Sequence, residues 1–175
     1  MEHGAEDQRV RRIVTGHNPR GRSVIISDTT AVMEGPLHEL WVTEGTPARF
    51  GGAPDLGALP VDLEPRKEGT VVRLVRFMPS QALSRDDLEQ MYSKGFAAIN
   101  ASHTRVDTRR HPAMHKTRTL DYGIVLSGRI KLLMDEGEQE LKPFDVVIQR
   151  GTNHGWVNPG SVPALMAFVL IDGTE

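Results

Sequence analysis

The sequence predicts an all-β domain with one helix. Between residues 111 and 171, short apolar segments are separated by turn-forming pairs such as Ser127-Gly128 and Asn158-Pro159. Short strands with tight turns at regular spacing are typical of an antiparallel sandwich or barrel. Helical periodicity occurs in a single segment, 84–100. A chain of 175 residues is long enough to bury one substantial core, so we expect one domain.

The composition excludes several classes of protein. The chain has no cysteine, which rules out disulfides, thiolate zinc sites and a cysteine nucleophile. No apolar stretch is long enough to span a membrane, and residues 1–8 are too polar for an export signal. A formal net charge of −2 gives no electrostatic case for nucleic acid. We expect a cytoplasmic protein without nucleic-acid or membrane partners.

The first part of the chain, residues 9–104, is predicted to add strands, a long loop and the helix to the barrel; residues 1–8 are expected to be disordered. Four segments have strand-like composition: 11–14, 23–26, 38–43 and 70–77. The turn residues of 18–21 join the first two as a hairpin. Residues 45–69 are rich in glycine and proline, which predicts a lid, a dimer arm or a passive surface loop.

The helix is predicted over residues 84–100. Ser84 can cap its N-terminus, and Asp86 and Asp87 suit the first turn. Apolar residues then recur at helical spacing, at Leu88, Met91, Tyr92, Phe96 and Ile99. This apolar stripe is expected to pack against the barrel or to serve as a dimer contact.

The second part, residues 105–172, is predicted to form the barrel itself. Its strands are expected at 111–119, 121–126, 129–134, 138–142, 145–149, 152–158 and 163–171. Because side chains alternate between the faces of a strand, His115, Thr117, Thr119 and Asp121 share one face. His154 and Trp156 share a face in the same way.

If both faces point inward, His115, Asp121 and His154 can converge. Two imidazoles and one carboxylate suit a divalent metal such as Fe, Mn, Ni, Zn or Cu, and they leave positions open on it. The alternative is structural: buried histidines are often only hydrogen-bonded, and Asp121 could accept bonds from threonine hydroxyls or a turn amide. No organic cofactor is indicated.

These residues resemble the cupin superfamily, whose motifs are G-x5-H-x-H-x3-4-E-x6-G and G-x5-P-x-G-x2-H-x3-N. His115 matches the first histidine, Thr117 stands in place of the second, and Asp121 stands in place of the glutamate, seven residues before Gly128. His154 and Asn158 match the second motif. The resemblance implies a double-stranded β-helix, or jelly roll, with N-terminal extra strands and one helix. It also implies a metal at His115, Asp121 and His154. A homodimer is the expected assembly, because an extra N-terminal strand region and a long arm commonly swap or pair between barrels.

The resemblance implies an enzyme that acts on a small oxygenated organic molecule, of decarboxylase, dehydratase, isomerase or dioxygenase type. His111 and Tyr122 are the acid–base candidates. The residues expected to contact substrate are Gln149, Asn153, Trp156, Thr117 and Thr119. One alternative is a non-catalytic module that binds a small molecule. Another is a sugar-nucleotide epimerase, which would need basic side chains that point into the barrel. Lys116 and Arg118 alternate with His115 along the chain and are therefore expected to point outward.

Overall fold

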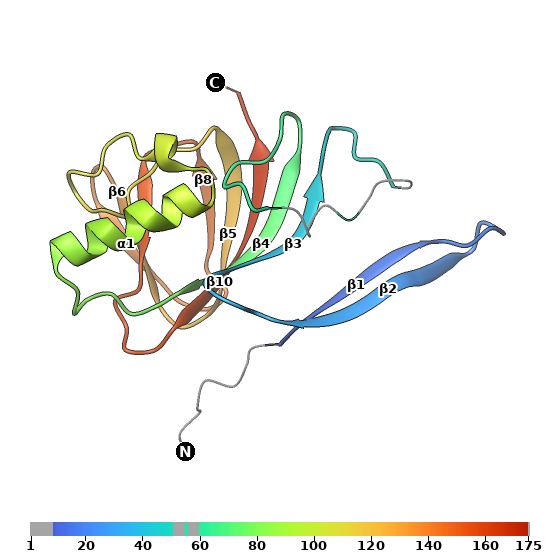
Figure 1. The fold of residues 1–175 in the computed structure, drawn as a ribbon, viewed down its shortest axis with the longest axis horizontal. Coiled ribbons are helices and arrows are strands. Elements are labelled where there is room, and N and C mark those ends of the chain that lie inside the picture. The colour runs from blue at the N-terminus through green and yellow to red at the C-terminus, as the bar shows by residue number, and fades with distance from the viewer. Residues whose placement is uncertain (1–8, 51–54, 56–59, 175) are drawn as a thin grey trace, which may run out of the picture.

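Two β-sheets face each other across the core, and a hairpin projects away from them (Figure 1). The computed structural model describes residues 9–50, 55 and 60–174. The prediction of disorder for residues 1–8 lies outside this described part of the chain. The all-β jelly-roll class predicted from the sequence is confirmed, with its N-terminal extra strands and its helix.

The larger sheet has five strands in the order β3-β4-β10-β5-β8. Their bounds are β3 Leu37–Thr43, β4 Thr70–Phe77, β10 Ala164–Asp172, β5 Thr119–Ser127 and β8 Val146–Arg150. The central strand β10 pairs antiparallel with both β4 and β5, so that Phe168 lies between Arg73 and Gly123. All three of these residues therefore face the same side of the sheet, which is the inside of the barrel.

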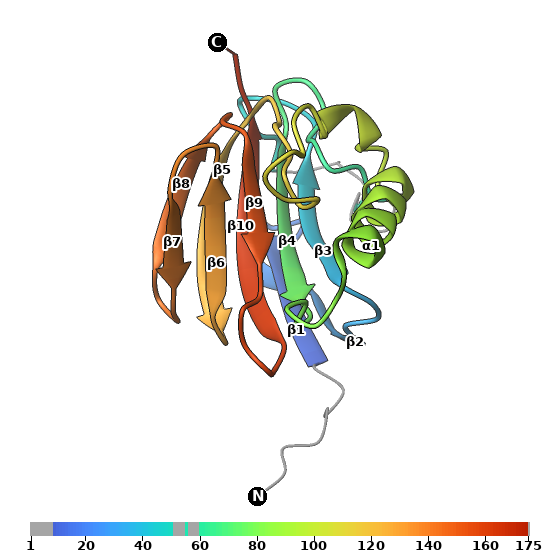
Figure 2. The same ribbon diagram turned by 90° about the vertical axis from the view of Figure 1, so that its left-hand side faces the viewer.

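The smaller sheet has three strands in the order β7-β6-β9. They are β6 Ile130–Met134, β7 Glu138–Leu141 and β9 His154–Val157, and Figure 2 shows them as a layer in front of the larger sheet. Val125, Ile130 and Met166 are fully buried between the two sheets. Gly128 makes the connection from β5 possible: its φ is +76°, and an added Cβ would lie 2.7 Å from the Cα of Ala164.

The predicted N-terminal hairpin is present as β1 Arg9–His17 and β2 Ser23–Val32. The side chain of Asn18 closes its turn by accepting hydrogen bonds from the backbone N–H groups of Arg20 and Arg22. Only the base of the hairpin packs on the barrel, where Val10 and Met33 join Leu74 and Leu165 on the outer face of the large sheet. The remainder extends away from the barrel (Figure 1).

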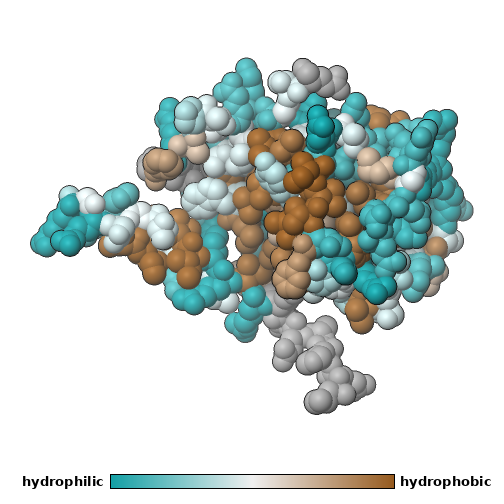
Figure 3. Space-filling model, turned by 180° about the vertical axis from the view of Figure 1, so that it is seen from behind, coloured by the Kyte–Doolittle hydropathy of each residue, from teal (hydrophilic) through white to brown (hydrophobic). Residues whose placement is uncertain are grey.

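Apolar side chains are exposed on this hairpin and on the outer face of the large sheet. On the hairpin they are Ile13, Val24, Ile25 and Ile26, and on strands β5 and β8 they are Tyr122, Leu126, Val146 and Ile148. Figure 3 shows hydrophobic residues gathered both along the hairpin and in the middle of the rear face. Apolar surface of this kind is typical of an interface.

The helix α1 spans Arg85–Ala98, close to its predicted bounds. Ser84 is its N-cap, and the Ser84 hydroxyl accepts a hydrogen bond from the N–H of Asp87 at 3.1 Å. The helix buries Leu88 and Phe96. A short 3-10 turn, η2 Ser102–Thr104, follows it and leads the chain back to the barrel.

The predicted strand over 111–119 is wrong for most of its length. Residues 111–114 form a turn instead, in which the N–H of Met114 donates to the carbonyl of His111 and the N–H of Ala113 donates to the ring Nδ1 of His111. Pro112 has no N–H to offer a strand ladder. His115 makes an isolated β-bridge to His154, and the regular strand begins only at Thr119.

The described residues of the predicted loop 45–69 form no helix or strand. The segment nonetheless contacts the barrel: the carbonyl of Asp62 accepts a bond from Arg73, and Glu64 accepts one from the N–H of Arg118. Within the part of the chain that is described, none of the helices has the length and apolar character needed to cross a membrane.

Candidate functional site

A partly open cavity of about 140 Å³ lies between α1 and the inner face of the large sheet. Most of its lining is apolar, and the rest is a small set of polar side chains. The lining residues come from β3, β4, β5, β9 and β10, the helix and two loops: Leu37, Leu63, Arg73, Val75, Phe77, Tyr92, Phe96, Ile99, Ala113, His115, Thr117, Asp121, His154, Trp156, Phe168 and Leu170. A dry apolar cavity of about 150 Å³ holds one benzene ring. This cavity is therefore the size of a small ring compound.

Two histidines stand side by side in the cavity wall. His115 and His154 pair through their backbones, each N–H donating to the other's carbonyl at 2.7 and 2.9 Å. This bridge sets their imidazole centroids 4.3 Å apart. Phe96 packs on His115 and Trp156 packs edge-on against His154, which fixes the orientation of both rings.

The tautomer of each histidine follows from its backbone contact. The Nδ1 of His115 lies 2.9 Å from the carbonyl of Ala113, and the Nδ1 of His154 lies 2.9 Å from the carbonyl of Thr152. A carbonyl can only accept, so both Nδ1 atoms carry hydrogen, and both Nε2 atoms keep a lone pair. Burial, with the neighbouring His154 and Arg105, lowers the pKa of His115 to about 3; burial lowers that of His154 to about 4. Both rings are neutral at pH 7.

Asp121 is the carboxylate of the cavity, projecting from β5. It is 5% exposed, and its Oδ1 has no hydrogen-bond partner among the described residues. Burial raises the pKa of Asp121 to about 6, although the hydroxyl of Thr119 and the charge of Arg73 oppose that rise. A carboxyl group with this pKa can exchange a proton with a bound molecule near neutral pH.

Arg73 is the polar residue of the cavity that the sequence reasoning missed. It projects from β4 into the lining and is 1% exposed. Its Nε lies 3.0 Å from the carboxylate of Glu39, and its Nη2 donates to the carbonyl of Asp62 at 2.8 Å. The signal was available in the predicted strand 70–77, because Val71, Arg73 and Val75 alternate on one face.

The structure brings five of the predicted site residues to the cavity: His115, Thr117, Asp121, His154 and Trp156. Thr119 is buried just behind this wall, where its hydroxyl lies 2.7 Å from that of Thr117. Thr119 therefore positions a lining residue and is not itself part of the lining.

The other predicted site residues lie outside the cavity lining. Tyr122 is on the outer face of β5 and is 38% exposed, because it follows the inward Asp121 by one residue. His111 is half-buried and packs edge-on against the ring of Tyr92. The side-chain amide of Gln149 donates to the carbonyl of Thr152, and that of Asn153 donates to Asp135 and to the carbonyl of Asp107. The side-chain amides of Gln149 and Asn153 thus hold loops in place. The roles predicted for Tyr122, His111, Gln149 and Asn153 stay predictions, and the position of these residues outside the cavity lining does not favour them.

The residues present fit a metal ion only in part. The two histidines have the arrangement of metal ligands: each Nδ1 donates to a carbonyl, and neither Nε2 makes a hydrogen bond within the described part of the chain. However, within residues 9–50, 55 and 60–174, no three His, Asp or Glu side chains are grouped so that they could hold a metal ion. Asp121 lies on a different sheet from His154 and interacts instead with Thr119 and Arg73. The predicted three-ligand set is not assembled.

Comparisons with known proteins agree with this fold. The family model of the cupin domain matches residues 103–171. The cupin-domain-containing oxidoreductase fogC of Aspergillus ruber is 30% identical over 178 residues, covering 94% of this chain and 73% of the relative. The chain belongs to the cupin family. The resemblance drawn from the two sequence motifs is confirmed, and the relationship extends through the N-terminal strands of this cupin.

Two further proteins show lower sequence identity to this chain. The cupin-domain-containing oxidoreductase virC of Hypocrea virens is 28% identical to this cupin over 94% of the chain and 77% of the relative. A solved structure, a cupin 2 conserved barrel domain protein from Salinispora arenicola CNS-205, is 16% identical with a TM-score of 0.38, and the match covers 59% of this chain and 63% of that one.

Proposed function

We propose that this cupin is an enzyme that converts a small oxygenated organic molecule held in the cavity between α1 and the large sheet. The observation that carries the proposal is the pair of buried, neutral histidines, whose Nδ1 atoms donate to carbonyls and whose Nε2 atoms make no hydrogen bond to a described residue, in the same cavity lining as a carboxyl group of raised pKa. Acid–base groups with perturbed pKa values in an apolar pocket are typical of active sites. The names of two relatives, both cupin-domain-containing oxidoreductases, favour the oxidative members of the reaction types expected from the sequence.

A division of roles follows from the positions of the polar groups. Asp121, with a pKa of about 6, exchanges a proton with the substrate. The neutral imidazoles of His115 and His154 accept hydrogen bonds from it, or bind a divalent transition metal as two nitrogen donors. Such a metal, when bound, supplies a Lewis acid or a redox centre. The aromatic rings of Phe96, Trp156 and Phe168 exclude water and hold the apolar part of the substrate.

A binding module without catalysis is the second candidate. It is favoured by the hydrogen bonds of Gln149, Asn153 and His111, which commit these groups to the protein itself. The epimerase alternative is disfavoured, because the side chains of Lys116 and Arg118 are exposed, as their parity predicted.

The test is metal content and turnover in the same preparations. Protein purified without chelators is analysed for Fe, Mn, Ni, Zn and Cu and then incubated aerobically with a panel of small phenols, keto acids and hydroxy acids. Substrate loss and oxygen consumption are followed. We expect turnover of at least one compound in the wild type and its loss in His154→Ala.

His17→Ala is the matched control, because His17 is exposed on the hairpin, away from the cavity. This variant should keep both metal content and turnover. If no compound is converted while some bind and raise the unfolding temperature, the binding module replaces the enzyme. If His154→Ala retains full turnover, the histidine pair is not the reactive centre.

A further inference from the structure

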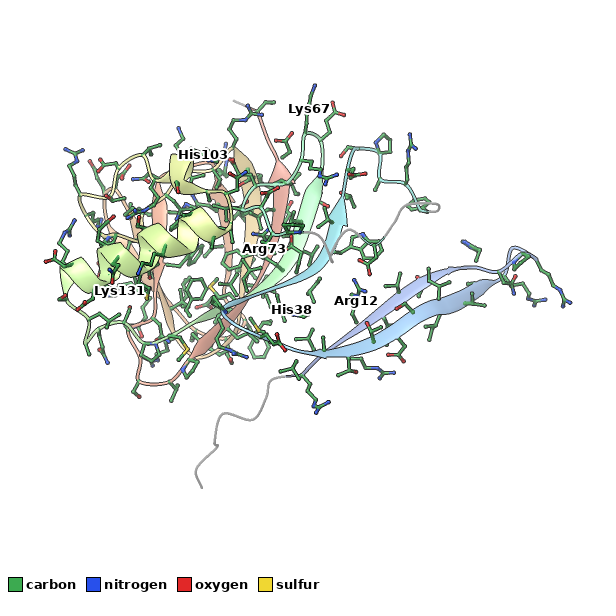
Figure 4. All side chains as sticks on the ribbon, viewed as in Figure 1. Arg12, His38, Lys67, Arg73, His103 and Lys131 are labelled. Carbon is green, nitrogen blue, oxygen red and sulfur yellow. The ribbon has the colours of Figure 1, made fainter. Side chains whose placement is uncertain are left out.

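The guanidinium of Arg73, a residue of the cavity lining, has two nitrogen atoms, Nε and Nη1, with no hydrogen-bond partner among the described residues. Nε and Nη2 face Glu39, and Nη2 also donates to the carbonyl of Asp62. Nη1 is buried and has no hydrogen-bond partner among the described residues. Arg73 lines the cavity, and Figure 4 labels it between α1 and the β3–β4 edge of the sheet.

We propose that Nη1 of Arg73 binds the carboxylate of the substrate, so that the molecule taken up by this cavity is a small acid with an apolar body. The proposal rests on the proposed function only in placing the substrate in this cavity. A planar guanidinium matches a carboxylate better than any other side chain does. The aromatic wall around Phe96, Trp156 and Phe168 faces the same space and suits a body of about one ring.

A purely structural role for Arg73 explains less of the geometry. An ion pair buried to this degree is seldom more stable than two apolar side chains of the same volume. Glu39 and Asp62 accept hydrogen bonds from Nη2, and Nε has an ion-pair contact with Glu39 without a hydrogen bond. A structural pair would therefore leave the N–H groups of Nη1 desolvated and unmatched. An acceptor atom on a bound molecule removes that cost.

The local charges determine how strongly the site attracts an anion. The carboxylates that act on Arg73 are Glu39, Asp121 and Asp62, in that order. Glu39 is the nearest, with a side chain 7% exposed, and it competes directly with any bound carboxylate. A substitution that removes the charge of Glu39 but keeps its shape and hydrogen-bonding groups should therefore strengthen anion binding. A purely structural role for Arg73 does not predict stronger binding.

The experiment compares acids with their own neutral amides. Propionate, benzoate and phenylacetate are titrated by calorimetry at pH 7.5 against propionamide, benzamide and phenylacetamide. The protein is used as purified and after dialysis against a chelator, so that a metal ion is not the partner of the carboxylate. We expect at least one acid to bind wild-type protein tenfold or more tightly than its amide.

Three variants assign this preference to Arg73. In Arg73→Met/Glu39→Leu, which removes both members of the ion pair so that no charge is left unpaired, the acid-to-amide ratio should fall to about one. In Glu39→Gln it should rise at least threefold. Arg105→Met is the matched control: Arg105 also pairs with a carboxylate and lies over the ring of Phe96, but it does not line the cavity, so the ratio should be unchanged.

Equal affinity for acids and amides in the wild type overturns the inference, and so does a preference that survives in Arg73→Met/Glu39→Leu. Failure of the enzyme proposal gives a different result. Acids would then bind preferentially through Arg73 without any compound being converted.

Discussion

The cavity and the N-terminal hairpin depart from the usual distribution of side chains in opposite directions. Around the cavity, polar groups are buried: Arg73, Asp121 and His154 are at most 5% exposed. On the hairpin, apolar groups are exposed, and Ile25 and Ile26 each show 61% of their surface. Buried polar residues and exposed apolar patches are the informative exceptions to the general pattern. We propose that the first is a site for a small molecule, and we predict that the second is a surface for a second copy of the chain.

The largest expected effect is on stability, where a substitution in the barrel core should cost far more than one on the hairpin. Phe168 packs between Trp156 and Phe77, with ring centroids 5.4 and 6.4 Å away. Phe168→Ala should lower the free energy of unfolding by about 3–5 kcal/mol. Ile25→Ala should cost about 0.5 kcal/mol or less. Urea unfolding of both variants measures this, and a comparable loss in each would mean that the hairpin belongs to the cooperative core.

The pH dependence of stability tests the buried histidines. Because the folded state keeps His115 and His154 neutral down to about pH 3 and 4, the unfolded state binds two more protons once the pH falls below about 6.5. Asp121 acts oppositely, since its pKa of about 6 lets the folded state take up a proton first. Between pH 8 and 5, the free energy of unfolding should therefore fall by roughly 2–3 kcal/mol.

Unfolding measured at several pH values checks this expectation. The double variant His115→Gln/His154→Gln lacks both imidazoles, so its stability should no longer fall between pH 8 and 5. A wild-type curve that is flat over this range would contradict neutral buried histidines. His17→Ala again serves as the control and should follow the wild type.

The cap of α1 is the next smaller effect. Ser84→Ala removes the hydroxyl that accepts from the N–H of Asp87, which should cost about 1 kcal/mol. Ser84→Thr keeps a hydroxyl that can accept from this N–H and donate to the carboxylate of Asp87, as Ser84 does at 2.6 Å, and should restore most of this loss. Thermal unfolding measures both variants, and identical midpoints for Ser84→Ala and the wild type would show that the first turn is held by tertiary contacts alone.

Charged substitutions on the hairpin should have the smallest effect on the stability of the subunit but a large effect on its oligomeric state. The exposed apolar residues of the hairpin and of strands β5 and β8 support a homodimer, which stays a prediction. We expect Ile25→Asp/Ile26→Asp to change the unfolding free energy of the subunit by about 0.5 kcal/mol or less. The same variant should convert a dimer into a monomer in sedimentation experiments. A monomeric wild type would contradict the assembly, and Thr29→Asp is a control on the same strand.

The fold was largely predictable because its signals are local. Turn residues such as Asn18 and Gly128 mark where strands end, and the cap at Ser84 marks where the helix begins. Alternation along a strand correctly placed Asp121 inside and Lys116 outside. The strand predicted over 111–119 was wrong for most of its length. The alternating pattern is present there, but residues 111–114 form a turn that depends on the ring of His111 and on Pro112.

The site was less predictable because it depends on partners distant in the sequence. Whether Gln149 and Asn153 face substrate depends on Thr152 and Asp135, which satisfy their amides. Arg73 lies on a strand outside the two motifs, and its neighbour Glu39 comes from another strand again. No local pattern tells a cavity-lining arginine from a surface one until the strand order is known.

The roof of the cavity has a different origin from its walls. Tyr92 and Phe96, which line the cavity, come from α1. The hydroxyl of Tyr92 donates a long hydrogen bond, of 3.4 Å, to the carbonyl of Trp156. The helix makes no hydrogen bonds of the β-sheets. Residues 84–100 can therefore be replaced by another helical segment without breaking a hydrogen bond between strands. We therefore expect a change in the size of the cavity to cost the scaffold least when it is made in this helix.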